Sequence, residues 1–155
     1  MRKALLLMTV LGFVGLLWAA DPIVGSWKLN LAKSKFAPND PAPKKQTEVY
    51  RETTPGQIEL TYKNTQADGA SNLLIISIPA QGGVNKRLRG DNGGAMEVET
   101  LIAPGEWCMT RLKDGKQIAS LHKLISKDGK TMTQRAAGKD AQGKPYQDIL
   151  VYDKQ

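Results

Sequence analysis

The chain has 155 residues, a formal net charge of +7 and a single cysteine. This length fits one domain, and one cysteine excludes an intramolecular disulfide. The basic residues are scattered rather than interleaved with aromatic ones, which argues against nucleic acid as a partner.

Residues 1–20 have the pattern of an export signal. Two basic residues precede an apolar run from Ala4 to Trp18, which is short for a membrane span of roughly 20 residues. We expect cleavage near Asp21. The bulky Trp18 close to that site keeps an uncleaved anchor as the alternative. The prediction is a signal peptide over 1–20 and a periplasmic or extracellular domain over 21–155, with no stable membrane association after cleavage.

Alternation with a period of two recurs along the rest of the chain. From Gln57 to Lys63 the apolar side chains fall on one face, as in a half-buried antiparallel strand. Turn signals such as Pro55-Gly56 and Asp114-Gly115 recur at intervals of about ten residues. Strands are expected at 24–29, 45–54, 57–66, 71–79, 84–89, 95–102, 106–112, 117–126, 130–137 and 145–152.

These hairpins predict an all-β fold, an up-and-down antiparallel β-barrel of about 8–10 strands. An open, strongly curled sheet would give the same pattern. In the strand at 95–102, we assign Met96 and Val98 to the interior and the alternating Glu97 and Glu99 to solvent.

The connection from Asn30 to Lys44 is the longest in the chain. It holds three prolines, and we expect one helical turn near Leu31 to Lys35 followed by an extended arm. The arm is either a loop over the barrel mouth or a plain connector.

Gly25-Ser26-Trp27 resembles the motif that opens lipocalins and fatty-acid-binding proteins, in which the tryptophan packs across the closed end of the barrel. The stretch from Gly25 to Phe36 is also similar to small secreted bacterial lipocalin-like (calycin) proteins. So are Ser126 to Thr133 and Val151 to Gln155. The resemblance implies a barrel in which Gly25 and Trp27 are structural.

The last strand departs from the fatty-acid-binding proteins. Those proteins hold the ligand carboxylate with Arg-x-Tyr, because a buried anion needs a cation and a hydrogen-bond donor. Here the corresponding residues are Leu150-Val151-Tyr152. Since Leu150 carries no charge, we expect no simple fatty acid as ligand. Arg111 and Arg135 are the candidate replacement cations.

Catalytic and metal-binding patterns are missing from the sequence. His122 is the only histidine, and there is neither a Gly-x-Ser-x-Gly nor a Cys-x-x-Cys motif. We therefore expect no catalytic residue, no metal and no cofactor. Cys108 is interpreted as a small buried apolar residue, with pairing to another chain as the alternative.

The function that these patterns favour is an exported, soluble protein that holds a small lipophilic or neutral-headed ligand inside the barrel. The alternatives are an envelope interaction or structural module with a filled interior, and an enzyme of unrecognised type. The candidate ligand-binding residues are Trp107, Tyr62, Tyr146, Tyr152, Arg111 and Arg135.

Overall fold

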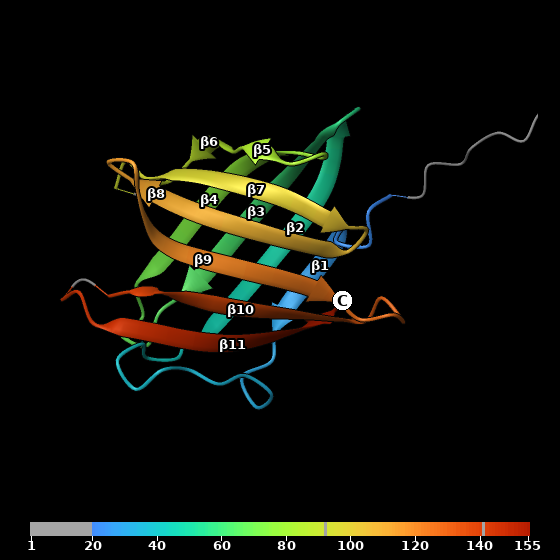
Figure 1. The fold of residues 1–155 in the computed structure, drawn as a ribbon. Helices are drawn as coiled ribbons and strands as arrows, with labels where there is room; N and C mark the ends of the chain where they lie inside the picture. The colour runs from blue at the N-terminus through green and yellow to red at the C-terminus, as the bar shows by residue number, and fades with distance from the viewer. Residues whose placement is uncertain (1–19, 92, 141) are drawn as a thin grey trace, which may run out of the picture.

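The structure is a computed structural model that describes residues 20–91, 93–140 and 142–155. The expected signal peptide therefore lies almost entirely outside the described residues. All regular elements within these ranges are β-strands (Figure 1). They are β1 (Gly25–Leu29), β2 (Lys45–Thr54), β3 (Gln57–Thr65), β4 (Ser71–Pro79), β5 (Gly83–Val84), β6 (Lys86–Arg89), β7 (Met96–Ala103), β8 (Glu106–Lys113), β9 (Lys116–Ile125), β10 (Thr131–Lys139) and β11 (Pro145–Lys154).

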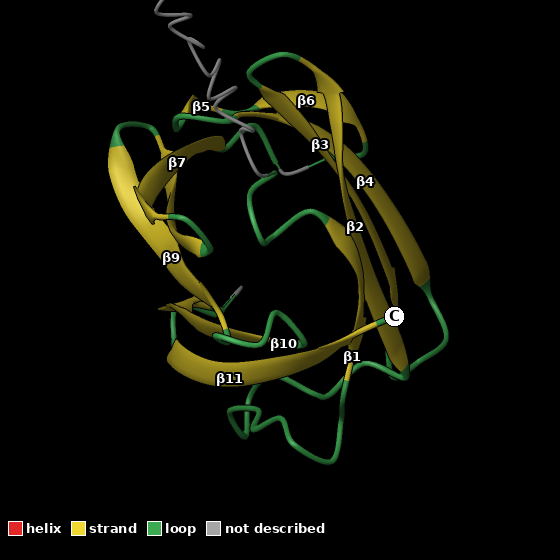
Figure 2. Cartoon of the chain, turned by 90° about the vertical axis from the view of Figure 1, so that its right-hand side faces the viewer, coloured by secondary structure: helices red, strands yellow, loops and turns green. Residues whose placement is uncertain are grey.

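The strands form one antiparallel sheet that curls into a nearly closed barrel (Figure 2). Their order is β5-β7-β8-β9-β10-β11-β1-β2-β3-β4-β6. The first and last strands of the chain pair with each other, with Trp27 opposite Lys154. The predicted segment 84–89 is divided between β5, which pairs with β7, and β6, which pairs with β4. The expected antiparallel barrel is thus confirmed, with 11 strands.

One end of the barrel is closed by a large apolar core. Trp27 is fully buried there, and its indole Nε1 donates a hydrogen bond to the carbonyl oxygen of Ile23 at 2.7 Å. Two residues before it, Gly25 has a φ of +140°, and a Cβ at this position would lie 2.6 Å from the Lys154 side chain. The core of this closed end comprises Ile23, Trp27, Ile58, Ile78, Trp107, Ile125 and Met132, together with residues packed around them.

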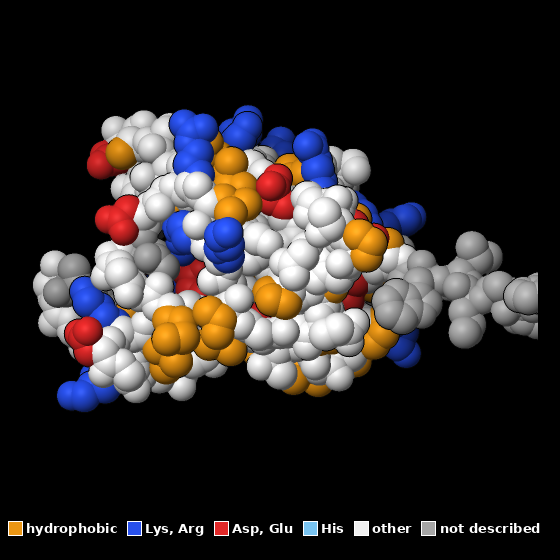
Figure 3. Space-filling view, turned by 90° about the horizontal axis from the view of Figure 1, so that it is seen from above, with side chains coloured by type: hydrophobic (Ala, Val, Ile, Leu, Met, Phe, Trp, Pro, Cys, Tyr) orange, Lys and Arg blue, Asp and Glu red, His pale blue; other side chains and the backbone are white. Residues whose placement is uncertain are grey.

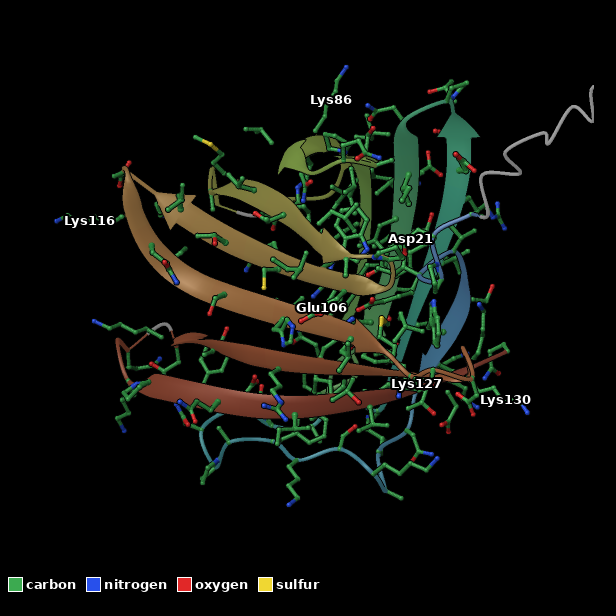
Figure 4. The ribbon with its side chains drawn as sticks, turned by 45° about the vertical axis from the view of Figure 1, so that its right-hand side comes forward. Asp21, Lys86, Glu106, Lys116, Lys127 and Lys130 are labelled. Carbon is green, nitrogen blue, oxygen red and sulfur yellow. The ribbon has the colours of Figure 1, made fainter. Side chains whose placement is uncertain are left out.

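Asp21 joins the segment before β1 to this closed end (Figure 4). Its carboxylate accepts hydrogen bonds from the backbone N–H of Gly105 at 3.3 Å and from Trp107 Nε1 at 3.4 Å. It also accepts from the N–H of Ile23 at 2.9 Å. Asp21, the residue at which we expect the mature chain to start, is therefore hydrogen-bonded to the closed end of the barrel.

The faces of β7 are the reverse of those expected from the sequence. Glu97 and Glu99 are buried inside the barrel, whereas Met96 is exposed outside it. The interior placement is stabilised because both carboxylates form ion pairs with cations of the barrel wall. The alternation correctly divides the residues of β7 into two faces. The assignment of the more hydrophobic face to the barrel interior was wrong.

The arm from Asn30 to Lys44 begins with a turn in which the N–H groups of Lys33 and Ser34 both bond the carbonyl of Asn30. The bond from Ser34 spans four residues, so a single helical turn forms at the expected place, and it does not continue into a helix. Lys35 then makes a reciprocal backbone bridge with Ile149 of β11, at 2.7 and 2.8 Å. β1 ends at Leu29, and beyond that point the arm takes its place as the backbone partner of β11. The arm runs below β11 in Figure 1.

On the face drawn in Figure 3, several lysine and arginine side chains lie along the upper edge of the view, and acidic and apolar side chains lie below and beside them. Among the described residues there is no helix long and apolar enough to cross a membrane.

Candidate functional site

The barrel encloses a cavity of about 540 Å³ between the closed-end core and the opposite end of the strands. Its mouth is marked by the exposed residues Ser71 and Asn72, at the end of β4 away from the core residue Ile78. Its wall combines apolar side chains with buried charged ones. The main interior residues are Gln46, Glu48, Tyr50, Leu60, Tyr62, Ile76, Glu97, Glu99, Met109, Arg111, Leu121, Lys123, Gln134 and Leu150.

The floor of this cavity is polar. Tyr50, Glu99 and Lys123 line both the cavity and a small void beside Trp107 in the closed-end core. Lys123 Nζ donates a hydrogen bond to Glu99 Oε1 at 2.8 Å, and each side chain is only 3% exposed. The same ammonium lies 5.6 Å from the centre of the Tyr50 ring. Glu99 Oε2 is buried without a hydrogen-bond partner among the described residues.

Glu48 is a second carboxylate at this level, and it is 4% exposed. Its Oε2 accepts hydrogen bonds from the Tyr50 hydroxyl at 2.7 Å and from Gln134 Nε2 at 2.8 Å. No lysine or arginine of the described chain forms an ion pair with it. Burial, followed by the charge of Glu48, raises the pKa of both Tyr50 and Tyr152 well above the usual range. Glu48 is thus held by neutral donors only.

Nearer the mouth, one carboxylate is shared by two guanidinium groups. Glu97 Oε1 accepts from Arg111 Nη2 at 2.8 Å and from Arg87 Nη2 at 3.0 Å. Glu97 is buried, while the Arg111 side chain is 35% exposed. This upper cluster has a formal charge opposite to that of the floor cluster of Glu48, Glu99 and Lys123.

A second cavity, of about 570 Å³, lies under the arm. Phe36 and Pro43 of the arm form part of its wall, opposite Tyr146. Burial, together with the hydrogen bond and charge of the neighbouring Asp148, raises the pKa of Asp40 in this wall to about 6. Gln46, Tyr62 and Leu150 line both cavities. The Tyr62 hydroxyl donates to Gln46 Oε1 at 3.2 Å, and Gln46 Nε2 in turn donates to the Tyr152 hydroxyl.

The residues predicted to bind a ligand fall into three groups. Tyr62 and Arg111 line the inner cavity, and Tyr146 lines the cavity under the arm. Trp107 and Tyr152 are buried core residues that line neither cavity, because their strand positions lie in or next to the closed-end layer. Arg135 is exposed on the outer face of β10, since its neighbour Gln134 points inward. Of the two candidate replacement cations, only Arg111 faces the cavity.

The polar floor was missed by the sequence prediction. Its residues are Glu48, Glu99, Lys123 and Gln134, and none of them belongs to a recognisable motif. The signal that identifies them is the register of the hairpins. Trp27 is opposite Glu48, and Trp107 is two positions before Met109, which is opposite Glu99. Trp107 is also opposite Lys123, which in turn is opposite Gln134.

Cys108 and His122 are opposite each other on the outer face of β8 and β9. His122 Nε2 lies 2.9 Å from Glu106 Oε1. Cys108 is half-buried rather than a core residue, and desolvation raises the pKa of its thiol, which disfavours the nucleophilic thiolate. No group of three or more metal-ligating side chains occurs in the described part of the chain.

The fold, a nearly closed antiparallel β-barrel of 11 strands in the described residues, is shared with solved structures of low sequence identity. Among solved structures, the fluorescent protein UnaG is similar at a TM-score of 0.59 and 14% identity, with 86% of this chain and 97% of UnaG covered. A zebrafish ileal bile acid-binding protein complexed with cholic acid gives a TM-score of 0.49 at 10% identity, with 86% and 99% covered. No protein-family model and no curated protein sequence matches the chain.

Proposed function

We propose that this protein binds a small, largely lipophilic molecule inside the barrel and that it performs this role after export, as a soluble protein. The observation that carries the proposal is the cavity of about 540 Å³ inside the barrel, which opens at one end. Ligand sites typically have volumes of about 300–1,000 Å³ and combine apolar walls with a few fixed polar groups. A module acting only through its outer surface has no use for such a cavity.

The ligand is not a simple fatty acid. Leu150 lines the cavity without offering a charge. The two cations of the wall that remain, Arg111 and Lys123, are already bonded to Glu97 and Glu99. Deep in the cavity, a ligand carboxylate would have to displace Glu99 from Lys123 or remain unpaired, and an unpaired buried anion is costly. The excess positive charge of Arg87 and Arg111 lies near the mouth, where the Arg111 side chain is 35% exposed.

A pair of matched tryptophan substitutions on β9 tests the location of the site. Leu121 lines the cavity, whereas Leu124 is exposed on the outer face of the same strand. We expect Leu121→Trp to fill the cavity and to abolish the binding of decanol measured by calorimetry, while Leu124→Trp binds decanol as the wild type does. Equal binding by both variants would refute an interior site. Mass spectrometry of organic extracts of the purified protein identifies the natural ligand.

Export is tested separately. Asp21 contacts Gly105 and Trp107, so a mature chain that starts at Asp21 keeps the contacts of the closed end. The intact mass of the protein recovered from an exporting host should correspond to a chain beginning at or near Asp21. A mass that retains residues 1–20 would contradict cleavage and favour the uncleaved anchor.

A further inference from the structure

The charges buried in the cavity wall are arranged in two clusters. In the upper cluster two arginines share Glu97, which leaves one formal positive charge near the mouth. In the floor cluster Lys123 is paired with Glu99, and Glu48 has no cation partner among the described residues. The floor therefore carries one formal negative charge that the protein does not neutralise.

The uncompensated charge at the floor is the more expensive of the two. Glu48 is 4% exposed, whereas the Arg111 and Arg87 side chains are 35% and 17% exposed and are partly solvated. Transfer of an unpaired carboxylate into a low-dielectric interior is costly even when neutral donors bind it. A positively charged ligand group bound at the floor would thus gain more binding free energy than a negatively charged group bound at the mouth.

The groups around Glu48 can accept a donor from a ligand. A carboxylate has about four lone-pair sites, and the hydrogen bonds from Tyr50 and Gln134 both reach Oε2. Glu99 Oε2 nearby is buried without a partner. Glu48, Glu99 and Tyr50 line the same cavity, and the charges of both carboxylates contribute to raising the pKa of the Tyr50 hydroxyl. The Tyr50 ring adds an aromatic face that attracts cations.

We propose that the polar group of the ligand is a protonated amine and that Glu48 at the cavity floor is its counter-ion, with the apolar part directed along Leu60, Met109 and Leu121. This inference rests on the proposed function and assigns the ligand class as a lipophilic ammonium compound. The sequence led us to expect a neutral head group, because Leu150 offers no cation to a ligand carboxylate. The buried carboxylates of the floor favour a positively charged head group instead.

Calorimetric titration with decylamine, decanol and decanoate at pH 7 tests this assignment on the mature protein. The three probes share an alkyl chain and differ in the charge of the head. The wild type should bind decylamine at least tenfold more tightly than decanol, and decanoate least tightly. The positive net charge of the protein disfavours adsorption of the amine to the outer surface.

The variant Glu48→Gln should lose the preference for decylamine and keep the affinity for decanol within threefold. The amide oxygen still accepts hydrogen bonds from Tyr50 and Gln134, so the local packing is conserved. Glu59→Gln is the matched control, because Glu59 lies on the outward face of β3 between the buried Ile58 and Leu60. It should behave as the wild type.

Decylamine that binds the wild type no more tightly than decanol overturns the assignment, and so does an undiminished preference in Glu48→Gln. If Glu48→Gln does not fold, the three wild-type titrations decide alone. Binding of decanol without a preference for the amine leaves the proposed function intact. Binding of none of the three probes counts against the proposed function itself.

Discussion

Lys123 and Glu99 form an ion pair of 2.8 Å inside the barrel, and each side chain is 3% exposed. The pair lies between the inner cavity and the closed-end core, since both residues line the inner cavity and the small void beside Trp107. Buried pairs of this kind are expensive to break, although the intact pair contributes little net stability.

Removal of only the cation should therefore destabilise the fold strongly. We expect Lys123→Met to lower the free energy of unfolding by roughly 3–5 kcal/mol, because it leaves the Glu99 carboxylate buried and unpaired. The double variant Lys123→Met with Glu99→Leu should recover most of this loss. Denaturant unfolding of the single and double variants measures both values, and equal losses in the two would contradict the explanation.

Trp27 should be the most sensitive position of the closed end. The ring is fully buried, so Trp27→Ala should cost roughly 3–5 kcal/mol through lost burial and the cavity left behind. Leu124→Ala is the control, because Leu124 is 47% exposed and should change stability by less than about 1 kcal/mol. If the denaturant midpoint and slope of Trp27→Ala equal those of the wild type, the indole ring does not contribute to the free energy of unfolding.

Stability should fall as the pH rises through the titration range of Asp40. The folded protein holds the pKa of Asp40 at about 6, above its ordinary 3.8, through burial and through the hydrogen bond and charge of Asp148. The folded state therefore binds the proton more tightly, and the resulting stability is present below pH 3.8 and lost as the pH rises through about 6. Because Asp40 is partly solvated, the effect should be modest.

The difference in unfolding free energy between pH 4 and pH 7 measures this effect. Asp40→Asn should reduce the pH dependence in this window. Asp68→Asn, which alters another carboxyl of the same cavity, should retain it. An unchanged slope in Asp40→Asn would exclude Asp40 as the origin.

The head-group preference of the cavity should respond to a new cation. Leu150 lines both cavities, so Leu150→Arg places a guanidinium against the bound ligand. We expect the affinity for decanoate to rise at least tenfold relative to decanol. Calorimetry on the wild type and the variant gives the ratio, and Ile149→Arg, on the outer side of β11, should leave it unchanged. An unaltered ratio in Leu150→Arg would mean that this position does not contact the head group.

The hairpin architecture could be predicted because each turn has a local signal. Pro55-Gly56 and Asp114-Gly115 fall between the observed strands, since glycine permits the positive φ that such turns require. The interior of the barrel could not be predicted in the same way. Glu97 and Glu99 are stabilised inside by Arg111 and Lys123, which lie on other strands, and a single-strand pattern contains no information about such partners.

Register supplies the missing information. Leu101 is opposite Trp107 across the turn at Pro104-Gly105. If Trp107 points inward, then alternation also turns Glu99 inward, because Leu101 and Glu99 share a face. A prediction that propagated the orientation of the tryptophans through the hairpins would have found the charged lining. Predicting which of these charged residues form ion pairs would still require the three-dimensional curvature of the nearly closed barrel.

The bonds of Asp21 to Gly105 and Trp107 also define the direction in which the barrel faces relative to any preceding chain. Asp21 is fixed at the closed end, whereas Ser71 and Asn72 mark the mouth at the other end of the strands. If residues 1–20 remained as an anchor, the domain would be attached to it at the closed end of the barrel. The mouth of the inner cavity would then lie at the end of the strands away from the attachment point.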